Sequence, residues 1–455
     1  MSLRSLKKNR SLLFYAALAI IIFLGLYLRL YAIIHTYVDT PIRADARDYY
    51  AYAYNLTNHG VYSLSTHSIK KGAQKPKPDA NRSPGYPIFI SIFANEFPSM
   101  SLLLNITLLQ GILSLITLIL TYKISIKISP KAPALLASFL TAISPHLINS
   151  NIYILTETLF TFFLVLTVYL TINFLKTPEK KQQLFLIGII VGLGCLTRPS
   201  LQYFVFPLTA FLLFVNKTVS LQQKKNMILL ILLGFTIIVA PWHVRNYIST
   251  GKFSDETLKI NALHHGMYPN FTFQNQIRSY GFPYRFDPRS KEISESIASV
   301  SREIIHRFKT EPEKHLKWYF IDKPITFFSW DIIQGMGESF IYPIKYSPYF
   351  DKHLFIKSNA IMRSLHYPIV ILAVIASILI WIPFFSASLP PMTTTIAQLL
   401  SLILFYFIFI HIILAPFPRY SVPLRPILYI MSVIPLLMLY NFKQQKKTNP
   451  RLTDS

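Results

Sequence analysis

The sequence has few charged residues and almost no cysteine. Asp, Glu, Lys and Arg make up 14% of its 455 residues, whereas a soluble globular chain carries about 25%. Hydrophobic residues account for 52%, so the low charge is typical of a protein with much of its surface in lipid. The single cysteine, Cys195, lies in an apolar run. An intramolecular disulfide is therefore excluded, and cysteine usage indicates no redox compartment.

Acidic residues are also scarce. Against 45 Lys and Arg there are only 20 Asp and Glu, which gives a formal net charge of +25. A basic balance can indicate nucleic-acid binding, but here many of the basic residues lie in short loops between apolar runs. Membrane proteins use such loops to fix their orientation and to meet anionic lipid. We therefore expect membrane lipids, and no nucleic acid, as partners.

Several motifs of well-known enzyme classes are missing from the sequence. The histidines form no HExxH or similar metal-binding pattern. The sequence contains no Gly-x-Ser-x-Gly or Walker-type loop, no Rossmann-type glycine motif and no internal repeat. These absences disfavour a lipase and a nucleotide-driven pump.

Apolar runs occupy most of the chain, and a membrane-spanning helix needs about 20 mostly apolar residues. The predicted spans are 12–34, 102–122, 132–148, 152–175, 227–242, 365–385, 396–415 and 422–439, together with two in the run 184–215. We divide that run at Thr197–Ser200, because a single helix would bury Arg198 in mid-membrane at a high cost in free energy. The sequence thus predicts an all-α polytopic membrane protein with about ten spans, and eleven to thirteen as the alternative.

Basic segments fix the predicted orientation. They are the N-terminus (Arg4, Lys7, Lys8, Arg10), three loops (Lys123, Lys127, Lys131; Lys176, Lys180, Lys181; Lys217, Lys224, Lys225) and the C-terminal tail (Lys443, Lys446, Lys447, Arg451). With ten spans, all of them fall on one side, which the positive-inside rule makes cytoplasmic. We expect a multi-pass protein of the plasma (inner) membrane with both termini in the cytoplasm.

This topology divides the chain into four parts. Residues 1–242 form an N-terminal transmembrane module with a first outer loop at 35–101, and 243–364 form an outer helical domain. Residues 365–440 form the C-terminal transmembrane helices, and 441–455 form a basic cytoplasmic tail. In the outer domain, Asp287-Pro288 predicts a helix start, and residues 310–313 predict a capping box for a helix that ends before Pro324.

Two acids follow the first span. Asp45 and Asp48 are three residues apart and would share one face of a helix near the lipid headgroups. A carboxylate in a water-filled membrane cavity can act as a general base or bind a cation. Alternatively, both pair with Arg43 and Arg47 in a solvated ionic cluster.

Further polar residues fall at the predicted outer face. Arg82 opens the turn Arg-Ser-Pro-Gly-Tyr86-Pro and can bind phosphate through two hydrogen bonds, unless this is an ordinary turn. Glu157 is costly in an apolar helix and is either functional or extends to the interface. Arg198 is either a phosphate ligand or an interfacial anchor. The remaining candidates for substrate contacts on this face are Tyr86, His243, Arg245 and Arg419. Acids and arginines that converge there suit a phosphate-bearing substrate from the outer leaflet.

Six of these segments, taken in order, resemble the GT-C glycosyltransferases. They are Asp45-x-x-x-Tyr49 with Gly60, Arg82-Ser-Pro-Gly-Tyr-Pro, Thr156-Glu157, Leu196-Thr-Arg-Pro, Pro241-Trp-x-x-Arg245-Asn and Arg419-Tyr-x-x-Pro423. The chain is similar to the bacterial protein mannosyltransferase-like and aminoarabinose-transferase-like enzymes. This resemblance extends over roughly residues 12–439.

The resemblance implies transfer of a sugar from a polyprenyl-phosphate donor to an acceptor outside the cytoplasm. By motif position Asp45 would be the general base, while Asp48 departs from the Asp-Glu pair of the protein mannosyltransferases. Glu157 would be a second acid near the site, and Arg82, Arg198 and Arg245 would bind the lipid phosphate. No cofactor is certain. The resemblance leaves open whether a divalent metal binds, and Asp45 and Glu157 would be its ligands. The acceptor is a lipid such as lipid A, a polysaccharide or a protein.

Two other functional classes are alternatives. A transporter or flippase would place charges near the bilayer midplane and often contains inverted repeats, whereas here the charges gather at one face. An O-antigen ligase-like protein would also use a lipid-linked sugar at the outer face. Its large outer loop, however, would come late in the chain.

Overall fold

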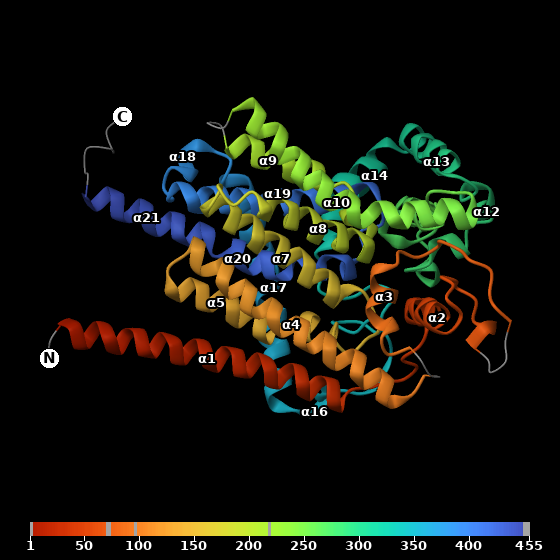
Figure 1. Ribbon diagram of the computed structural model, residues 1–455, viewed down its shortest axis with the longest axis horizontal. Coiled ribbons are helices and arrows are strands. Elements are labelled where there is room, and N and C mark those ends of the chain that lie inside the picture. The colour runs from red at the N-terminus through yellow and green to blue at the C-terminus, as the bar shows by residue number, and fades with distance from the viewer. Residues whose placement is uncertain (1–2, 70–73, 95–97, 217–219, 449–455) are drawn as a thin grey trace.

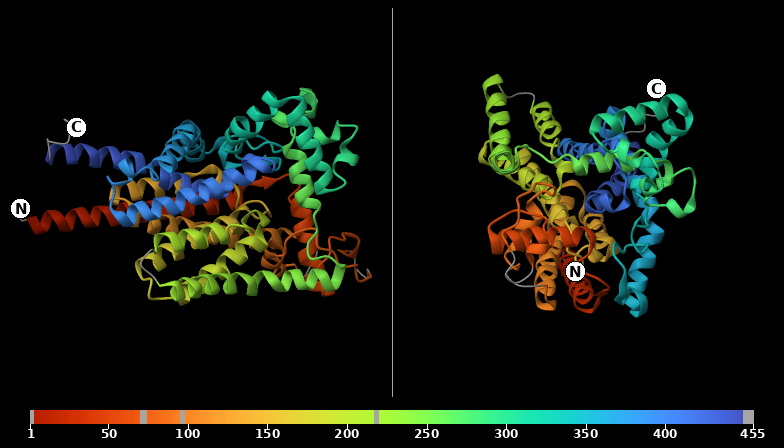
Figure 2. Two further views of the ribbon diagram at one scale, coloured as in Figure 1. Left: turned by 90° about the horizontal axis from the view of Figure 1, so that it is seen from above. Right: turned by 90° about the vertical axis from the view of Figure 1, so that its right-hand side faces the viewer.

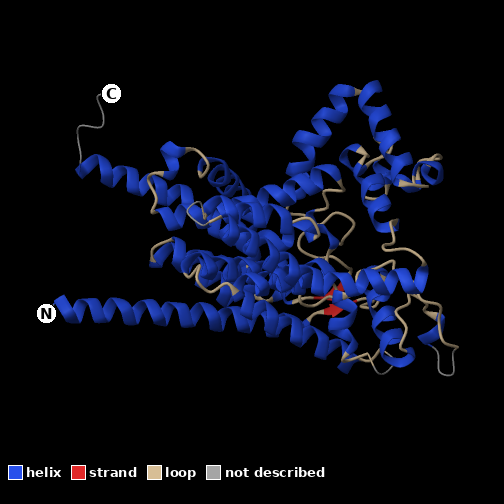
Figure 3. Ribbon diagram, turned by 45° about the horizontal axis from the view of Figure 1, so that its top comes forward, coloured by secondary structure: helices blue, strands red, loops and turns tan. Residues whose placement is uncertain are grey.

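Helices make up most of the structure (Figure 3). The computed structural model describes residues 3–69, 74–94, 98–216 and 220–448. Of the basic residues used for the orientation, Lys217 and Arg451 lie outside the described residues. In the described part the only sheet has two strands, β1 (Tyr37–Val38) and β2 (Ile344–Tyr346). These strands pair antiparallel, with Tyr37 opposite Tyr346.

Long apolar helices form the bundle. Its members are α1 (Leu3–His35), α4 (Met100–Ile128), α5 (Lys131–Ile143), α7 (Glu157–Lys176), α8 (Gln182–Thr197), α9 (Val205–Val215), α10 (Leu221–Thr250), α17 (His353–Leu379), α19 (Pro391–Ile413), α20 (Arg425–Ser432) and α21 (Ile434–Thr448). Both termini lie toward one end of this bundle, and α2 (Ala44–His59), α3 (Gly85–Ser91), α12 (Ser290–Ile293) and α13 (Ile297–Thr310) lie at the other (Figures 1 and 2). The prediction of an all-α polytopic membrane protein is confirmed.

Every predicted span corresponds to an apolar helix, but not every helix is long. In the described part of the chain, seven helices are long and apolar enough to cross a membrane, and three shorter ones are Lys131–Ile143, Gln182–Thr197 and Pro199–Val215. The predicted break at Thr197–Ser200 is present, since α8 ends at Thr197 and a short 3₁₀ helix (Pro199–Leu201) follows.

Two predicted spans have the wrong ends. Helix α10 continues through Pro241 to Thr250, and α17 begins at His353, well before residue 365. Hydropathy detects only the apolar residues that can lie in lipid. The hydrogen-bonded helix continues beyond them through polar and aromatic residues.

A third predicted span, 152–175, starts too early. Helix α7 begins at Glu157, and the buried residues before it form bends. The side-chain amide of Gln110 donates to the carbonyl oxygens of Asn151 and Tyr153, both at 2.9 Å. Non-helical backbone is stable at membrane depth only where other groups bind it, so Gln110 permits the helix to start at Glu157.

The outer segment is helical but is divided differently from the prediction. The helix predicted to start at Asp287-Pro288 is broken into α12 and α13, because Ser296 caps α13 by accepting from the amide of Ser299 at 3.1 Å. The predicted capping box is wrong: Thr310 ends α13, and its hydroxyl donates to the carbonyl of His306. Pro324 ends no helix either. A π-helical turn (Trp318–Asp322) joins α14 (Pro312–Lys317) to α15 (Lys323–Phe327), whose first turn tolerates proline.

Helices α8 and α10 touch through their backbones. A Cβ atom added at Gly188 would lie 2.1 Å from the carbonyl oxygen of Ile231, and one at Gly234 would lie 2.2 Å from that of Phe185. Small residues permit this close approach in membrane bundles. The contact fixes the end of α8, after which Arg198 follows.

Replacing Gly188 with valine is expected to lower the midpoint of thermal unfolding in detergent. Overpacking of a tight contact costs typically about 1–3 kcal/mol, and here the side chain would meet backbone rather than a flexible side chain. The matched control is Leu186→Val, which changes a partly exposed side chain on the same helix. An unchanged midpoint in Gly188→Val would contradict the close contact.

Candidate active site

Six charged side chains meet at the end of the bundle that is opposite the termini. We call them the charged cluster: Asp45, Asp48, Arg82, Glu157, Arg198 and Arg419. They come from α2, the turn before α3, the start of α7, the end of α8 and the 3₁₀ segment Pro418–Leu424. The cluster joins parts of the chain that are far apart in sequence, as the predicted outer face requires.

Asp45 lies at the centre of the cluster. It is in the first turn of α2, where the helix dipole favours a negative charge. Ala44 precedes it with a φ of 44°, a strained conformation for a residue with a side chain. One carboxylate oxygen of Asp45 accepts from Arg82 Nη2 and the other from Arg419 Nη2, both at 2.8 Å. Two arginines from distant segments therefore bind one carboxylate.

Glu157 forms the second centre. Its side chain is fully buried, and its Oε1 accepts from Arg198 Nη2 and from Arg419 Nε, both at 2.5 Å. Its Oε2 has no partner among the residues that the structure describes. Thr156 accepts from Arg198 Nε at 2.7 Å. Glu157 therefore does not extend to the interface but pairs inside the protein.

Arg82 and Asp48 complete the cluster. Arg82 donates to Asp48 Oδ2 from Nη2 at 2.8 Å and from Nε at 3.3 Å. Three carboxylates thus alternate with three guanidinium groups in a continuous chain of ion pairs. The alternative pairing with Arg43 and Arg47 is largely absent, because only Arg47 approaches an acid, Asp48, at 3.6 Å, and Arg43 lies over the ring of Tyr342.

Electrostatics keep Asp45 ionised. Burial opposes its charge, but the nearby Arg419 and Arg82 outweigh burial and lower the pKa of Asp45 to about 2. Burial, reinforced by the charge of Asp45, raises the pKa of Tyr49 to about 12. A carboxylate with so low a pKa is a weak base. Asp45 therefore gains basicity only if its arginines are drawn away.

Three residues that were predicted as substrate contacts lie outside the ion pairs. Tyr86 is buried, packs its ring on Tyr49, and donates from its hydroxyl to Gln110 at 2.8 Å. His243 contacts the carbonyl of Phe253 at 2.8 Å. Arg245 donates to the carbonyls of Asp79 and Tyr62, at 2.6 and 2.9 Å. Its guanidinium group therefore holds the first loop.

Arg245 connects to Arg82 through Tyr62. The hydroxyl of Tyr62 donates to the carbonyls of Arg82 and Ser83, at 3.0 and 3.1 Å. The guanidinium of Arg245 also stacks over the rings of Tyr62 and Trp242. Arg245 is thus a positioning residue for the segment that carries Arg82.

Replacing Arg245 with glutamine is expected to increase deuterium exchange in residues 74–83. The change removes the two hydrogen bonds that hold the carbonyls of Asp79 and Tyr62 to α10. Exchange measured by mass spectrometry on the whole protein checks this, with His243→Gln as the control on the same helix. Equal exchange in Arg245→Gln and the unmodified protein would contradict the positioning role.

Sequence reasoning missed three residues that support the site. Gln110 holds the backbone before Glu157. The hydroxyl of Tyr342 accepts from the amide of Ala46, at 3.4 Å. Lys323 is buried and donates to the carbonyls of Ile412 and Leu414, at 2.7 and 3.0 Å, at the end of α19 just before Arg419. A lone Gln in an apolar run was the only available signal, because partners of backbone carbonyls leave no spacing pattern.

The cluster does not fit a preformed metal site. Asp45 and Glu157, the expected ligands, both bind Arg419, so a guanidinium group lies where a cation would have to bridge them. In the described ranges no group of three or more His, Cys, Asp or Glu side chains gathers in a way that could hold a metal ion. We therefore derive no step through a metal.

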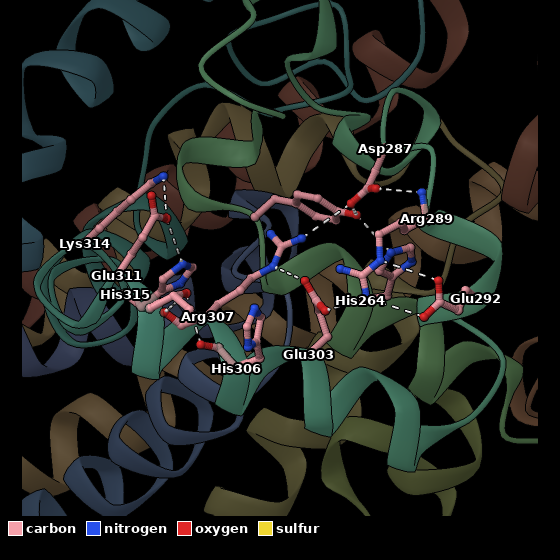
Figure 4. Close-up of polar contacts among 12 residues, drawn as sticks. His264, Asp287, Arg289, Glu292, Glu303, His306, Arg307, Glu311, Lys314 and His315 are labelled. Atoms are coloured by element: carbon pink, nitrogen blue, oxygen red, sulfur yellow. Dashed lines mark hydrogen bonds and ion pairs between the residues drawn. The ribbon is translucent and has the colours of Figure 1, made fainter.

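A second polar group lies in the outer segment (Figure 4). Asp287 accepts from the hydroxyl of Tyr268 at 2.7 Å and from Arg307, and Glu303 accepts from Arg307 at 2.8 Å. Arg289 pairs with Glu303 at 3.2 Å. These contacts join α13 to the loop before α12 and satisfy one another, so the group acts as a structural tie.

One family model matches part of the chain. The family model for dolichyl-phosphate-mannose-protein mannosyltransferase matches residues 81–244, which include Arg82, Glu157 and Arg198. No curated protein sequence matches the chain.

Solved structures match over nearly the whole chain. The oligosaccharyltransferase AglB from Archaeoglobus fulgidus, in complex with an inhibitory peptide and a dolichol-phosphate, is 13% identical with a TM-score of 0.50, and the match covers 97% of this chain. Its apo form is 12% identical with a TM-score of 0.50 and 96% coverage. In both comparisons the chain spans 52% of the archaeal protein's length.

A further match is ArnT from Cupriavidus metallidurans bound to undecaprenyl phosphate. It is 11% identical with a TM-score of 0.38 and covers 96% of this chain and 78% of that one. At these identities the likeness to the archaeal structures concerns the fold. The family match concerns residues 81–244, and over nearly the whole chain the similarity to the archaeal oligosaccharyltransferase is one of fold.

Proposed function

We propose that the protein transfers a sugar from a polyprenyl-phosphate donor to an acceptor at the outer face of the plasma (inner) membrane. The observation that carries this proposal is the charged cluster, in which three arginines pair with three acids at one end of an apolar bundle. Fixed guanidinium groups stabilise charge that develops on a leaving phosphate. Arg82, Arg198 and Arg419 would supply this stabilisation.

In the proposed reaction Asp45 accepts the proton of the acceptor's hydroxyl or amine. The acceptor atom forms a bond to the anomeric carbon, usually with inversion. The bond from that carbon to the phosphate oxygen breaks, and its electron pair stays on the polyprenyl phosphate. Asp48 would hold Arg82 in place, and Glu157 would hold Arg198 and Arg419, since each acid accepts from those arginines.

The proposed orientation rests on charge. Basic loops gather at the end of the bundle that carries the termini, and α2 and α3 lie at the other end (Figure 1). The positive-inside rule would make the first end cytoplasmic. Residues 35–101 and 243–364 would then face the periplasm or cell exterior, where they would meet a lipid, polysaccharide or protein acceptor.

Donor turnover tests the proposal. Purified protein in detergent or nanodiscs would be given a panel of polyprenyl-phosphate sugars with lipid, polysaccharide and peptide acceptors, and released polyprenyl phosphate would be measured. Release with one donor and one acceptor supports the transferase and names both substrates. A flippase would instead move the intact donor across vesicles without releasing phosphate. That result would overturn the proposal.

A further inference from the structure

In each arginine of the charged cluster, the Nε and Nη2 atoms already donate to a side chain of the described structure. Those of Arg82 donate to Asp48 and Asp45. Those of Arg419 donate to Glu157 and Asp45, and those of Arg198 donate to Thr156 and Glu157. A phosphate that binds one of these arginines through Nε and Nη2 must therefore take the place of an acceptor that is already there.

Charge balance leads to the same conclusion. Three carboxylates face three guanidinium groups, so the cluster carries no excess positive charge that would attract an anion. An added phosphate would be the fourth anion in a half-buried site, where unpaired charge is costly. Binding is favourable only if one carboxylate leaves the arginines.

Exposure indicates which carboxylate leaves. The side chain of Glu157 is 0% exposed and that of Asp45 is 27% exposed, the highest value among the three acids. Asp45 can therefore turn toward water at a smaller cost than Glu157, which would remain buried without its partners. Asp45 also joins Arg82 to Arg419, so its departure frees one donor on each of two arginines.

Building on the proposed function, we propose that the donor phosphate binds by displacing Asp45 from Arg82 and Arg419, and that this exchange releases Asp45 to act on the acceptor. Without donor, Asp45 is paired and cannot accept a proton readily. With donor, its two arginines bind the phosphate, and its carboxylate is free beside the reacting centre. The exchange makes donor binding a precondition for activation of the acceptor.

The test is the affinity for polyprenyl monophosphate, measured by titrating undecaprenyl phosphate onto the whole protein in nanodiscs. Asp45→Asn is expected to bind about tenfold more tightly than the unmodified protein, because a neutral amide competes weakly for the two arginines. Asp48→Asn provides a second variant should Asp45→Asn fold poorly, and it is also expected to bind more tightly. Asp39→Asn is the matched control, since Asp39 is exposed and pairs with Lys345 at 3.1 Å.

Asp48→Asn also separates exchange from a general effect of charge, because it removes one acid but leaves Asp45 bound to Arg82 and Arg419. Its gain in affinity should therefore be smaller than that of Asp45→Asn. Equal gains in the two variants would overturn the exchange.

The affinity of Asp45→Asn for undecaprenyl phosphate can also contradict the proposal. Weaker binding in Asp45→Asn would mean that the carboxylate helps to hold the phosphate, for example through a shared cation, and would overturn the exchange while leaving the proposed function standing. Unchanged binding would do the same. If no variant and no unmodified protein binds undecaprenyl phosphate, the proposed function itself fails.

Discussion

Replacing Asp45 with asparagine is expected to lower turnover roughly 10²- to 10⁴-fold, the range that a positioned general base contributes. The variant should fold, because an amide oxygen can still accept from one of the two arginines that bind Asp45. Release of polyprenyl phosphate, with the donor and acceptor that the turnover assay selects, measures the loss. Asp39→Asn, an exposed position just after strand β1, should retain full turnover.

Retained turnover in a folded Asp45→Asn protein would remove Asp45 as the base. The loss in turnover should appear together with tighter binding of undecaprenyl phosphate. A variant that binds more strongly and turns over less distinguishes a lost base from a lost substrate site, since a lost site would weaken both properties.

Replacing Arg419 with glutamine is expected to reduce both stability and turnover. The change leaves three acids with two arginines in the charged cluster, and an uncompensated buried charge costs up to about 3–5 kcal/mol. Turnover should fall at least about 10²-fold, because a donor to the developing phosphate charge is lost. Unfolding by denaturant and the phosphate-release assay measure the two effects.

A double variant separates these effects. Arg419→Gln combined with Asp45→Asn removes the excess negative charge and should recover part of the lost stability without recovering turnover. If the single Arg419→Gln variant were as stable as the unmodified protein, the ion pairs of Arg419 would not contribute to the folded state.

The helical bundle could be predicted because lipid imposes a simple requirement. Each apolar run had to form its own backbone hydrogen bonds, and Arg198 in mid-run required a break. The ends of helices were less predictable. Whether α7 begins at residue 152 or at Glu157 depends on Gln110, which lies on another helix.

The members of the charged cluster were also accessible from the sequence. Asp45, Arg82, Glu157, Arg198 and Arg419 had been assigned to one face, and the structure brings them into contact. Arg245 shared that face and the same residue type, yet its guanidinium binds the carbonyls of Asp79 and Tyr62. A sequence does not show which backbone carbonyls a side chain will bind. The location of Arg245 at this face could therefore be predicted, but its hydrogen-bond acceptors could not.

The position of Arg419 in the chain sets the order in which the site can assemble during synthesis. Asp45, Asp48 and Arg82 leave the ribosome early and can form a group with one excess negative charge, and Glu157 with Arg198 can form a separate neutral pair. Arg419 arrives last, 374 residues after Asp45, and is the cation that joins the two groups and completes neutrality. A nascent chain released before that point would hold two unconnected halves, so the finished centre requires a chain made at least as far as Arg419.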